Sequence, residues 1–205
     1  MSKNIALIAN KESGKTTLAN VLVEQYGYKR LSFAGPVYAI TDNILDTFEV
    51  ELNRLYRSQD LTLKQRDDVV TCLTAWGKIT APENKFLKRG LLQGVGEGCR
   101  SIISETVWIE KLLKSALEMH QIGQPVVVDD CRYSNEILAL HKSGFKLIHL
   151  LKENSDSIHP SEQVEANMAF VKKQFKLEPD LVIPYSLGKD ASKSVLEDFM
   201  NSLSK

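Results

Sequence analysis

The chain has 205 residues, of which 26 are Lys or Arg and 26 are Asp or Glu, so its formal net charge is zero. Its hydrophobic content of 43% and charged content of 25% are those of an ordinary soluble globular protein, which excludes a disordered or membrane-embedded chain. Because no net charge attracts nucleic acid or a membrane surface, the binding of any anionic ligand has to be local.

Cysteine usage and the start of the chain bear on the compartment. Cys72, Cys99 and Cys131 are odd in number and lack metal-ligand spacing, which is typical of free thiols in a reducing compartment. No tract approaches a transmembrane span, and the first residues lack the layout of a signal peptide. We therefore expect a cytoplasmic protein (in the host cell, if it is viral) and a role for Cys131 as a small buried hydrophobe.

The first element in the chain is an apolar run, residues 3–9, that leads directly into the sequence NKESGKTT at residues 10–17. This pattern predicts a strand, a tight turn and the start of a helix. It matches the nucleotide-phosphate loop G-x-x-x-x-G-K-[ST], except that Ala9 replaces the first glycine. The replacement is tolerable if Ala9 has a negative φ angle and intolerable if the loop needs a positive one there.

The residue types in this loop suit a polyphosphate ligand, because the loop can point successive backbone N–H groups at it. Gly14 would let the backbone come close, Lys15 would reach the β- and γ-phosphates, and the Thr16 hydroxyl would ligate Mg²⁺. The alternative is an ordinary turn that caps a helix, since Ser and Thr are favoured at helix starts. The motif also follows a buried-looking strand and opens a helix, which favours the phosphate loop.

The remaining elements alternate along the chain. Strands are expected at residues 28–33, 124–130, 145–151 and 181–184, and helices at 15–26, from 132 to about 143, and at 190–203. Residues 34–36 (Ala-Gly-Pro) are expected to break the chain before a long, mostly helical region at 37–86. This alternation predicts an α/β fold with a parallel sheet and helices on both faces, and no linker divides it into independent domains.

Polar residues follow the expected strands at the edge where parallel sheets bind ligands. Asp129 and Asp130 end the clearest apolar strand, and either could place a carboxylate near Mg²⁺, or else cap the following turn. Arg132 suits a substrate phosphate or a base, and its alternative is an ion pair with Glu136, one helical turn later. Lys152 follows the next strand and belongs to the same edge.

Residues 88–100 concentrate glycine and arginine, and we interpret them as a loop that closes on a ligand. Arg89 and Arg100 would clamp the phosphate of an acceptor, and Gln93 would recognise a base edge. The alternative is an exposed turn with solvated arginines. Trp108 and its apolar neighbours indicate core packing more than base stacking.

The polar segment 152–162 follows a strand and ends at a proline-started helix, a position that in nucleotide kinases corresponds to a lid that excludes water. His159 within it is as typical of a helix start as of a ligand contact.

Taken together, these pieces resemble the deoxynucleoside monophosphate kinases of bacteriophages, a branch of the P-loop nucleoside monophosphate kinases. The matching motifs are, in chain order, residues 11–17, 33–36, 92–100 with Trp108 behind them, 128–136 and 159–162. Only the phosphate loop and residues 130–136 are specific individually, and their collinear order strengthens the resemblance. It implies an α/β P-loop NTPase three-layer sandwich in which residues 1–205 form a single kinase domain: a core at 1–35 and 100–205, a helical substrate-binding insertion at about 36–99, and a lid at about 152–165.

The resemblance implies transfer of the γ-phosphoryl group of ATP to a deoxynucleoside monophosphate, for DNA synthesis, with Mg²⁺ as cofactor. Catalytic roles are implied for Lys15, Arg100 and Arg132; ATP contacts for Lys11, Ser13, Gly14, Lys15, Thr16, Thr17 and Lys152; substrate contacts for Phe33, Arg89, Gln93, Arg100, Trp108, Asp130, Arg132 and Glu136; and metal contacts for Thr16, Asp129 and Asp130. The sequence departs from the family pattern at Ala9, at Glu97, and at Lys152 where arginine is expected. Lysine keeps the charge but loses the bidentate fork.

Two rival interpretations stay open at this point. One is a P-loop kinase for another phosphorylated small molecule, such as phosphomevalonate, and the other is a catalytically decayed nucleotide sensor. A nucleic-acid-processing ATPase is disfavoured because the chain has no basic excess. The expected partners are therefore small-molecule nucleotides, with neither nucleic acid nor membrane, and the resemblance is compatible with a homodimer.

Overall fold

The computed structural model describes residues 3–10, 12–57, 61–80, 85–151 and 163–203, which belong to two compact units. The core unit comprises residues 1–33 and 108–205, and the helical unit comprises residues 34–107. Lys11, Lys152 and most of the predicted lid lie outside the described residues.

The core unit is built on a five-stranded parallel sheet, as far as the structure describes the chain. Its strands are β1 (Ile5–Ala9), β2 (Lys29–Leu31), β3 (Val126–Cys131), β4 (Lys146–Leu151) and β5 (Leu181–Pro184). Their order across the sheet is β2-β3-β1-β4-β5. All five residues of β1 are fully buried, as expected for a central parallel strand covered on both faces.

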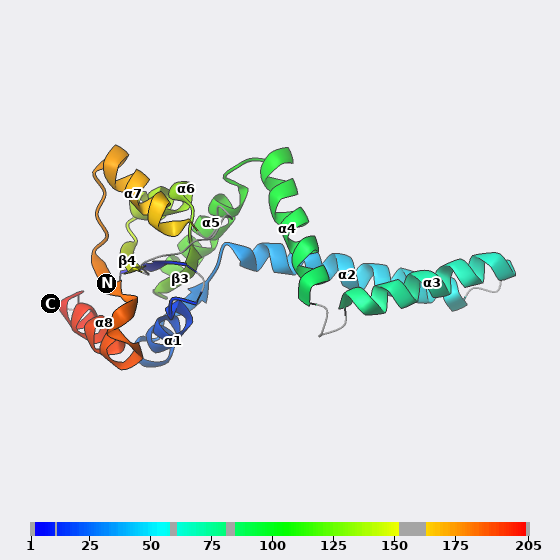
Figure 1. Cartoon of the computed structure of the whole chain (residues 1–205), viewed down its shortest axis with the longest axis horizontal. Helices are drawn as coiled ribbons and strands as arrows, with labels where there is room; N and C mark the ends of the chain where they lie inside the picture. The colour runs from blue at the N-terminus through cyan, green and yellow to red at the C-terminus, as the bar shows by residue number, and fades with distance from the viewer. Residues whose placement is uncertain (1–2, 11, 58–60, 81–84, 152–162, 204–205) are drawn as a thin grey trace. The chain divides into compact units, whose positions relative to one another are not determined.

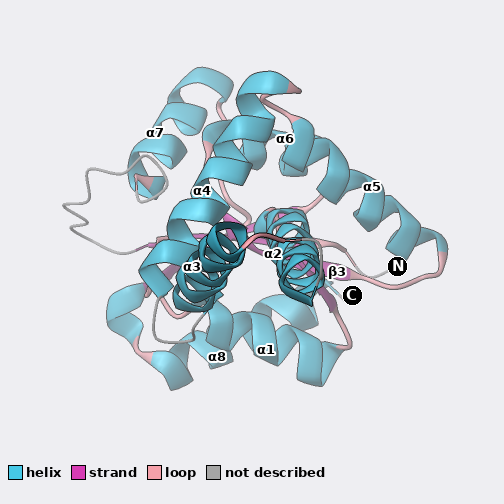
Figure 2. Cartoon of the chain, turned by 90° about the vertical axis from the view of Figure 1, so that its right-hand side faces the viewer, coloured by secondary structure: helices cyan, strands magenta, loops and turns pink. Residues whose placement is uncertain are grey.

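Helices cover both faces of this sheet. Those of the core unit are α1 (Lys15–Tyr26), α5 (Val107–Gln121), α6 (Ser134–Lys142), α7 (Val164–Phe175) and α8 (Lys189–Leu203), together with the 3-10 helix η2 (Tyr185–Leu187). In Figure 2, α1 and α8 lie on one face and α5, α6 and α7 on the other. The predicted three-layer α/β fold is confirmed.

Helix α1 has the bounds that the sequence predicts, and its buried apolar face and the glycine that follows it explain why. Leu18 and Leu22 of α1 pack with Leu7 of β1 and Leu196 of α8 in one buried cluster. Gly27 ends α1 in a left-handed conformation (φ +69°), and its N–H donates to the Leu22 carbonyl oxygen. A residue without Cβ adopts that conformation at little cost, which is why glycine commonly follows a helix.

The helical unit contains α2 (Ala34–Arg57), α3 (Leu63–Thr80) and α4 (Lys85–Ile102). Helices α2 and α3 lie side by side (Figure 1), and the rings of Phe48 and Trp76 stack between them with centroids 5.3 Å apart. The prediction that residues 34–36 break the chain is wrong, because α2 starts at Ala34. Pro36 falls in the first helical turn, where a missing N–H leaves no intrahelical bond unmade.

The predicted loop at residues 88–100 is also wrong, because these residues lie within α4. Leu91, Leu92, Val95 and Cys99 repeat at helical spacing and are half-buried, and this apolar stripe outweighs the cost of the glycines. At Gly96 the helix comes close to Val37 of α2: a Cβ built there would lie 3.7 Å from the Val37 side chain.

Within the described ranges, none of the helices combines the length and the apolar character needed to span a lipid bilayer.

Candidate functional site

The loop between β1 and α1 is shaped by two residues in the left-handed region of backbone space, Glu12 (φ +61°) and Gly14 (φ +83°). The Gly14 carbonyl oxygen accepts the N–H groups of Thr17 at 3.0 Å and Leu18 at 3.3 Å, which begins α1. The buried Ser13 hydroxyl donates to the Asn10 carbonyl oxygen at 2.8 Å and closes the loop from inside. The chain therefore turns sharply between a buried strand and a helix N-terminus, where backbone N–H groups and the helix dipole favour an anion.

Lys15 turns back over this loop. Its Nζ donates to the Asn10 carbonyl oxygen at 2.9 Å and lies 3.4 Å from the Ala9 carbonyl oxygen. A cation is thus held at the end of the central strand, beside the first turn of α1. The neighbouring residue Thr16 is exposed.

Ala9 has a backbone conformation in which alanine is tolerated. It is the last residue of β1, pairs with Leu150 of β4, and is fully buried. Its extended backbone does not require glycine, since a side chain is strained only at positive φ. Replacing the first glycine of the motif with alanine therefore leaves the loop geometry intact.

The two aspartates at the end of β3 have different surroundings. Asp129 is buried, and its Oδ2 accepts a hydrogen bond from Arg30 Nη2 in an ion pair with β2. Arg30 is opposite Val127 in the strand register, and Val127 belongs to the cluster packed beneath α1. The Arg30–Asp129 pair therefore lies on the α1 face of the sheet. Asp130 instead accepts the backbone N–H of Phe33 at its Oδ1, at 2.9 Å.

The turn after β3 is held by Glu136. This buried carboxylate accepts the backbone N–H groups of Arg132 at 2.9 Å and Tyr133 at 3.1 Å through Oε2. On the other side of the peptide chain, the Arg132 carbonyl oxygen accepts a hydrogen bond from Asn167 Nδ2 at 3.0 Å. The backbone of Arg132 is thus fixed on both sides, and α6 begins two residues later, at Ser134.

A pocket of about 380 Å³ lies beside the phosphate loop in the core unit. It is lined by Glu12, Ser13, Gly14, Thr17, Leu18, Leu150, Ile183, Pro184, Tyr185, Ser186, Gly188, Lys189 and Ser192. Its wall from Pro184 to Lys189 was missed by the sequence analysis. The sequence signal available for this wall was Gly188, which stands between the last strand and the last helix. In the structure its φ angle is +79°.

The other predicted site residues are distributed over both units. Phe33 and Trp108 are each only 4% exposed in the core unit, so Trp108 has the packing role that the sequence favoured. Arg89, Gln93 and Arg100 lie on α4 of the helical unit. Their spacings of four and seven residues put them on one face of that helix, although they had been predicted on a loop.

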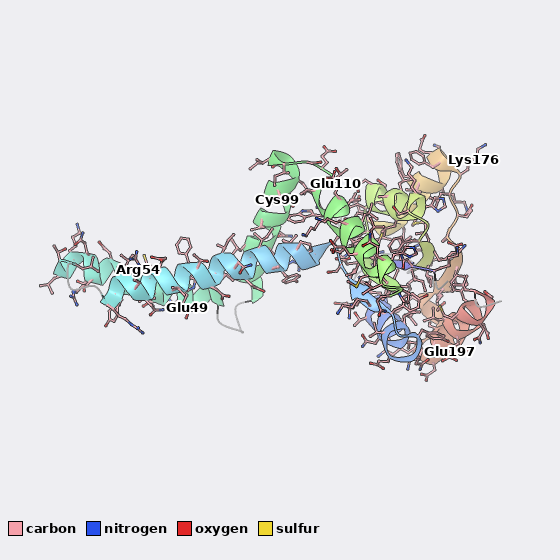
Figure 3. The ribbon with its side chains drawn as sticks, turned by 180° about the vertical axis from the view of Figure 1, so that it is seen from behind. Glu49, Arg54, Cys99, Glu110, Lys176 and Glu197 are labelled. Carbon is pink, nitrogen blue, oxygen red and sulfur yellow. The ribbon has the colours of Figure 1, made fainter. Side chains whose placement is uncertain are left out.

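Cys131 is fully buried in β3, which confirms its predicted role as a small hydrophobe. Burial, with smaller contributions from Glu136 and Asp130, raises the pKa of its thiol well above the usual range. The thiol therefore stays protonated and unreactive. Cys72 and Cys99 are also free thiols, and Cys99 is labelled on α4 in Figure 3.

No family model matches the chain. A putative deoxynucleotide monophosphate kinase from Acanthamoeba polyphaga mimivirus is 27% identical over 163 residues, which are 77% of this chain and 79% of that protein. The solved structure of dephospho-CoA kinase from Campylobacter jejuni is similar with a TM-score of 0.51 at 13% identity, covering 98% of this chain and 97% of that one. The chain shares the fold of that kinase.

Proposed function

We propose that this protein transfers the γ-phosphoryl group of ATP to a deoxynucleoside monophosphate and yields the diphosphate. The observation that carries the proposal is the phosphate loop with Lys15 folded back over it, its Nζ 2.9 Å from the Asn10 carbonyl oxygen. The similarity to a protein named as a putative deoxynucleotide monophosphate kinase supports the choice of acceptor.

In this proposal the loop binds the donor. The loop N–H groups and Lys15 bind the β- and γ-phosphates, with Ser13, Gly14 and Thr17 around them. The pocket between the loop and η2 takes the nucleoside of ATP, because it adjoins Gly14 and Thr17 and has both apolar and polar walls. The side chain of Tyr185, half-exposed at this wall, offers a flat surface for a base.

Mg²⁺ would be held by the Thr16 hydroxyl and a carboxylate of the 129–130 pair, which are hard oxygen ligands. Of that pair, Asp129 lies on the α1 face, where it is paired with Arg30. In the part of the chain that the structure describes, no three His, Cys, Asp or Glu side chains cluster as a metal site. Mg²⁺ typically takes one or two protein ligands and fills the rest with phosphate oxygens and water. When bound, it neutralises phosphate charge.

The acceptor would be oriented by arginines. In the core unit, Arg132 offers a bidentate donor for its phosphate. The acceptor contacts predicted for Arg89, Gln93 and Arg100 of α4 and for Phe33 of the core unit stay predictions. Trp108 is kept as a packing residue, since it is only 4% exposed. Asp130 and Glu136 would act here by fixing the Phe33 and Arg132 backbones, which they contact directly. The acceptor phosphate is already anionic, so catalysis needs positioning and charge neutralisation and no general base.

The test is ADP formation from ATP and Mg²⁺ with dAMP, dCMP, dGMP and dTMP offered one at a time. ADP that depends on one or more of these acceptors supports the proposal. If none of the four supports turnover, the assay is repeated with other phosphorylated small molecules, and turnover with one of them would assign the protein to the first rival class. Tight ATP binding with no turnover of any acceptor would indicate a nucleotide sensor.

A further inference from the structure

Helix α7 contacts two separate parts of the site through polar groups. At its first residue, the Val164 N–H donates to Asn10 Oδ1 in the phosphate loop, at 3.3 Å. One turn later, Asn167 Nδ2 donates to the Arg132 carbonyl oxygen at 3.0 Å. A single helix therefore contacts both the loop that carries Lys15 and the turn that carries Arg132.

The first contact is buried. Asn10 is 1% exposed and Val164 is fully buried, so neither polar group can exchange its partner for water. The carbonyl oxygen of the same Asn10 accepts hydrogen bonds from Ser13 Oγ and Lys15 Nζ. Asn10 thus contacts α7 through its side chain and Lys15 through its backbone carbonyl oxygen.

The second contact completes the fixation of Arg132. Glu136 accepts a hydrogen bond from the Arg132 N–H, and Asn167 donates one to the Arg132 carbonyl oxygen. Both backbone polar groups of Arg132 are therefore bound by side chains. Of these two side chains, Glu136 belongs to α6, the next helix after Arg132 in the chain, and Asn167 belongs to α7.

Helix α7 is also packed against the rest of the core unit, independently of its contacts with Asn10 and Arg132. This packing holds the helix in place. Val164, Met168 and Val171 are buried along one side of it. Next to them, Glu165 Oε2 lies 3.1 Å from Nε2 of His149, a buried residue of β4.

We infer that α7 is a brace that holds the phosphate loop and the Arg132 turn in fixed positions, with Asn10 and Asn167 as its positioning residues. The inference rests on the proposed function, in which the loop binds ATP and Arg132 binds the acceptor. Phosphoryl transfer depends mainly on the relative placement of the two reactants, so the brace would act on the reaction without touching either reactant.

The test compares Asn10→Ala and Asn167→Asp with Gln174→Ala, which removes an exposed amide from the same helix. Dissociation constants for ATP and for each of dAMP, dCMP, dGMP and dTMP are measured by calorimetry, together with kcat and the melting temperature. Asn167→Asp keeps the size of the side chain and removes its N–H donor. If Asn10→Ala does not fold, Val164→Pro removes the same hydrogen bond from the donor side, at a first helical position where proline is tolerated.

We expect Asn10→Ala to weaken ATP about tenfold and leave the monophosphate unchanged, and Asn167→Asp to do the reverse, as for the loss of one buried hydrogen bond. Both should lower kcat, and Gln174→Ala should change nothing. The inference is overturned if folded variants keep both dissociation constants, or if each variant weakens both ligands equally. The two binding measurements need no turnover, so they remain decisive even if the wild-type protein phosphorylates none of the acceptors.

Discussion

Lys15 and Asn10 are joined by a hydrogen bond of 2.9 Å from the lysine ammonium to the backbone carbonyl oxygen, so the cation is already directed over the phosphate loop. Replacing Lys15 with alanine should lower kcat at least about 10²-fold, because the charge at the transferred phosphoryl group is lost. The melting temperature should change little, since Lys15 is only half-buried. Steady-state kinetics and thermal unfolding check this.

The matched control for that variant is Lys142→Ala, which removes an exposed lysine at the end of α6. Its activity should equal that of the wild type. Full turnover by Lys15→Ala would remove the phosphate loop from the mechanism.

Ala9→Gly tests whether the departure from the loop motif matters. Ala9 is a fully buried strand residue with an extended backbone, so glycine gains nothing in the folded state. The variant should lose about 1 kcal/mol of unfolding free energy through its lost methyl group and its freer unfolded chain, with unchanged kcat. Denaturant titration and kinetics measure both. An inactive parent rescued by this substitution would instead mean that the loop had decayed.

Glycine to alanine substitutions at Gly14 and Gly90 should have opposite effects on stability. Apart from the adjoining backbone, no described atom lies within 4 Å of a Cβ built at either position, so only the backbone conformation decides. Gly14 has φ +83°, and alanine there should cost about 1–2 kcal/mol. Gly90 lies within α4, where alanine should stabilise by about 1 kcal/mol. Melting temperatures that move in the same direction would contradict the two backbone conformations.

Ionisation of the Tyr28 phenol should lower the stability of the protein at alkaline pH. Burial raises the pKa of its phenol to about 12 from 10.0, and its hydroxyl donates to the Lys3 carbonyl oxygen at 2.7 Å. The unfolded chain releases this proton first, so its contribution is complete below pH 10.0 and is lost as the pH rises toward 12. Tyr28→Phe should cost about 1 kcal/mol near neutral pH and show a smaller alkaline loss. Urea unfolding of both proteins across that range provides the measurement, and identical alkaline slopes would refute the shift.

Much of the core unit could be predicted because local signals and burial agree there. The helix Lys15–Tyr26 follows from its apolar spacing and from Gly27, and the strand Leu181–Pro184 from its β-branched run between polar residues. At Lys29–Leu31 the strand is shorter than expected, because only these residues pair with β3.

The helical unit was harder to predict because two signals conflict in α4. Gly90, Gly94, Gly96 and Gly98 each lower helix propensity, and together they suggested a loop. The same segment also carries a half-buried apolar repeat, and helix α4 packs on α2. Such tertiary packing supplies most of the stability of a helix in a protein.

Part of the candidate site was missed for a different reason. The pocket wall at Tyr185 and Gly188 carries no motif, and it becomes visible only when β5 is placed beside β4 and the loop next to them. The phosphate loop, by contrast, is defined by residues that are adjacent in the sequence.

Direct transfer of the phosphoryl group is the central claim, and ATP labelled with ³²P at the γ-phosphate tests it. The labelled ATP is incubated with Mg²⁺, the protein and each deoxynucleoside monophosphate in turn, and the products are separated by thin-layer chromatography. We predict that the label appears in a deoxynucleoside diphosphate with the wild-type protein and not with Lys15→Ala. Label found only in inorganic phosphate, or left entirely in ATP for every acceptor, would contradict the account.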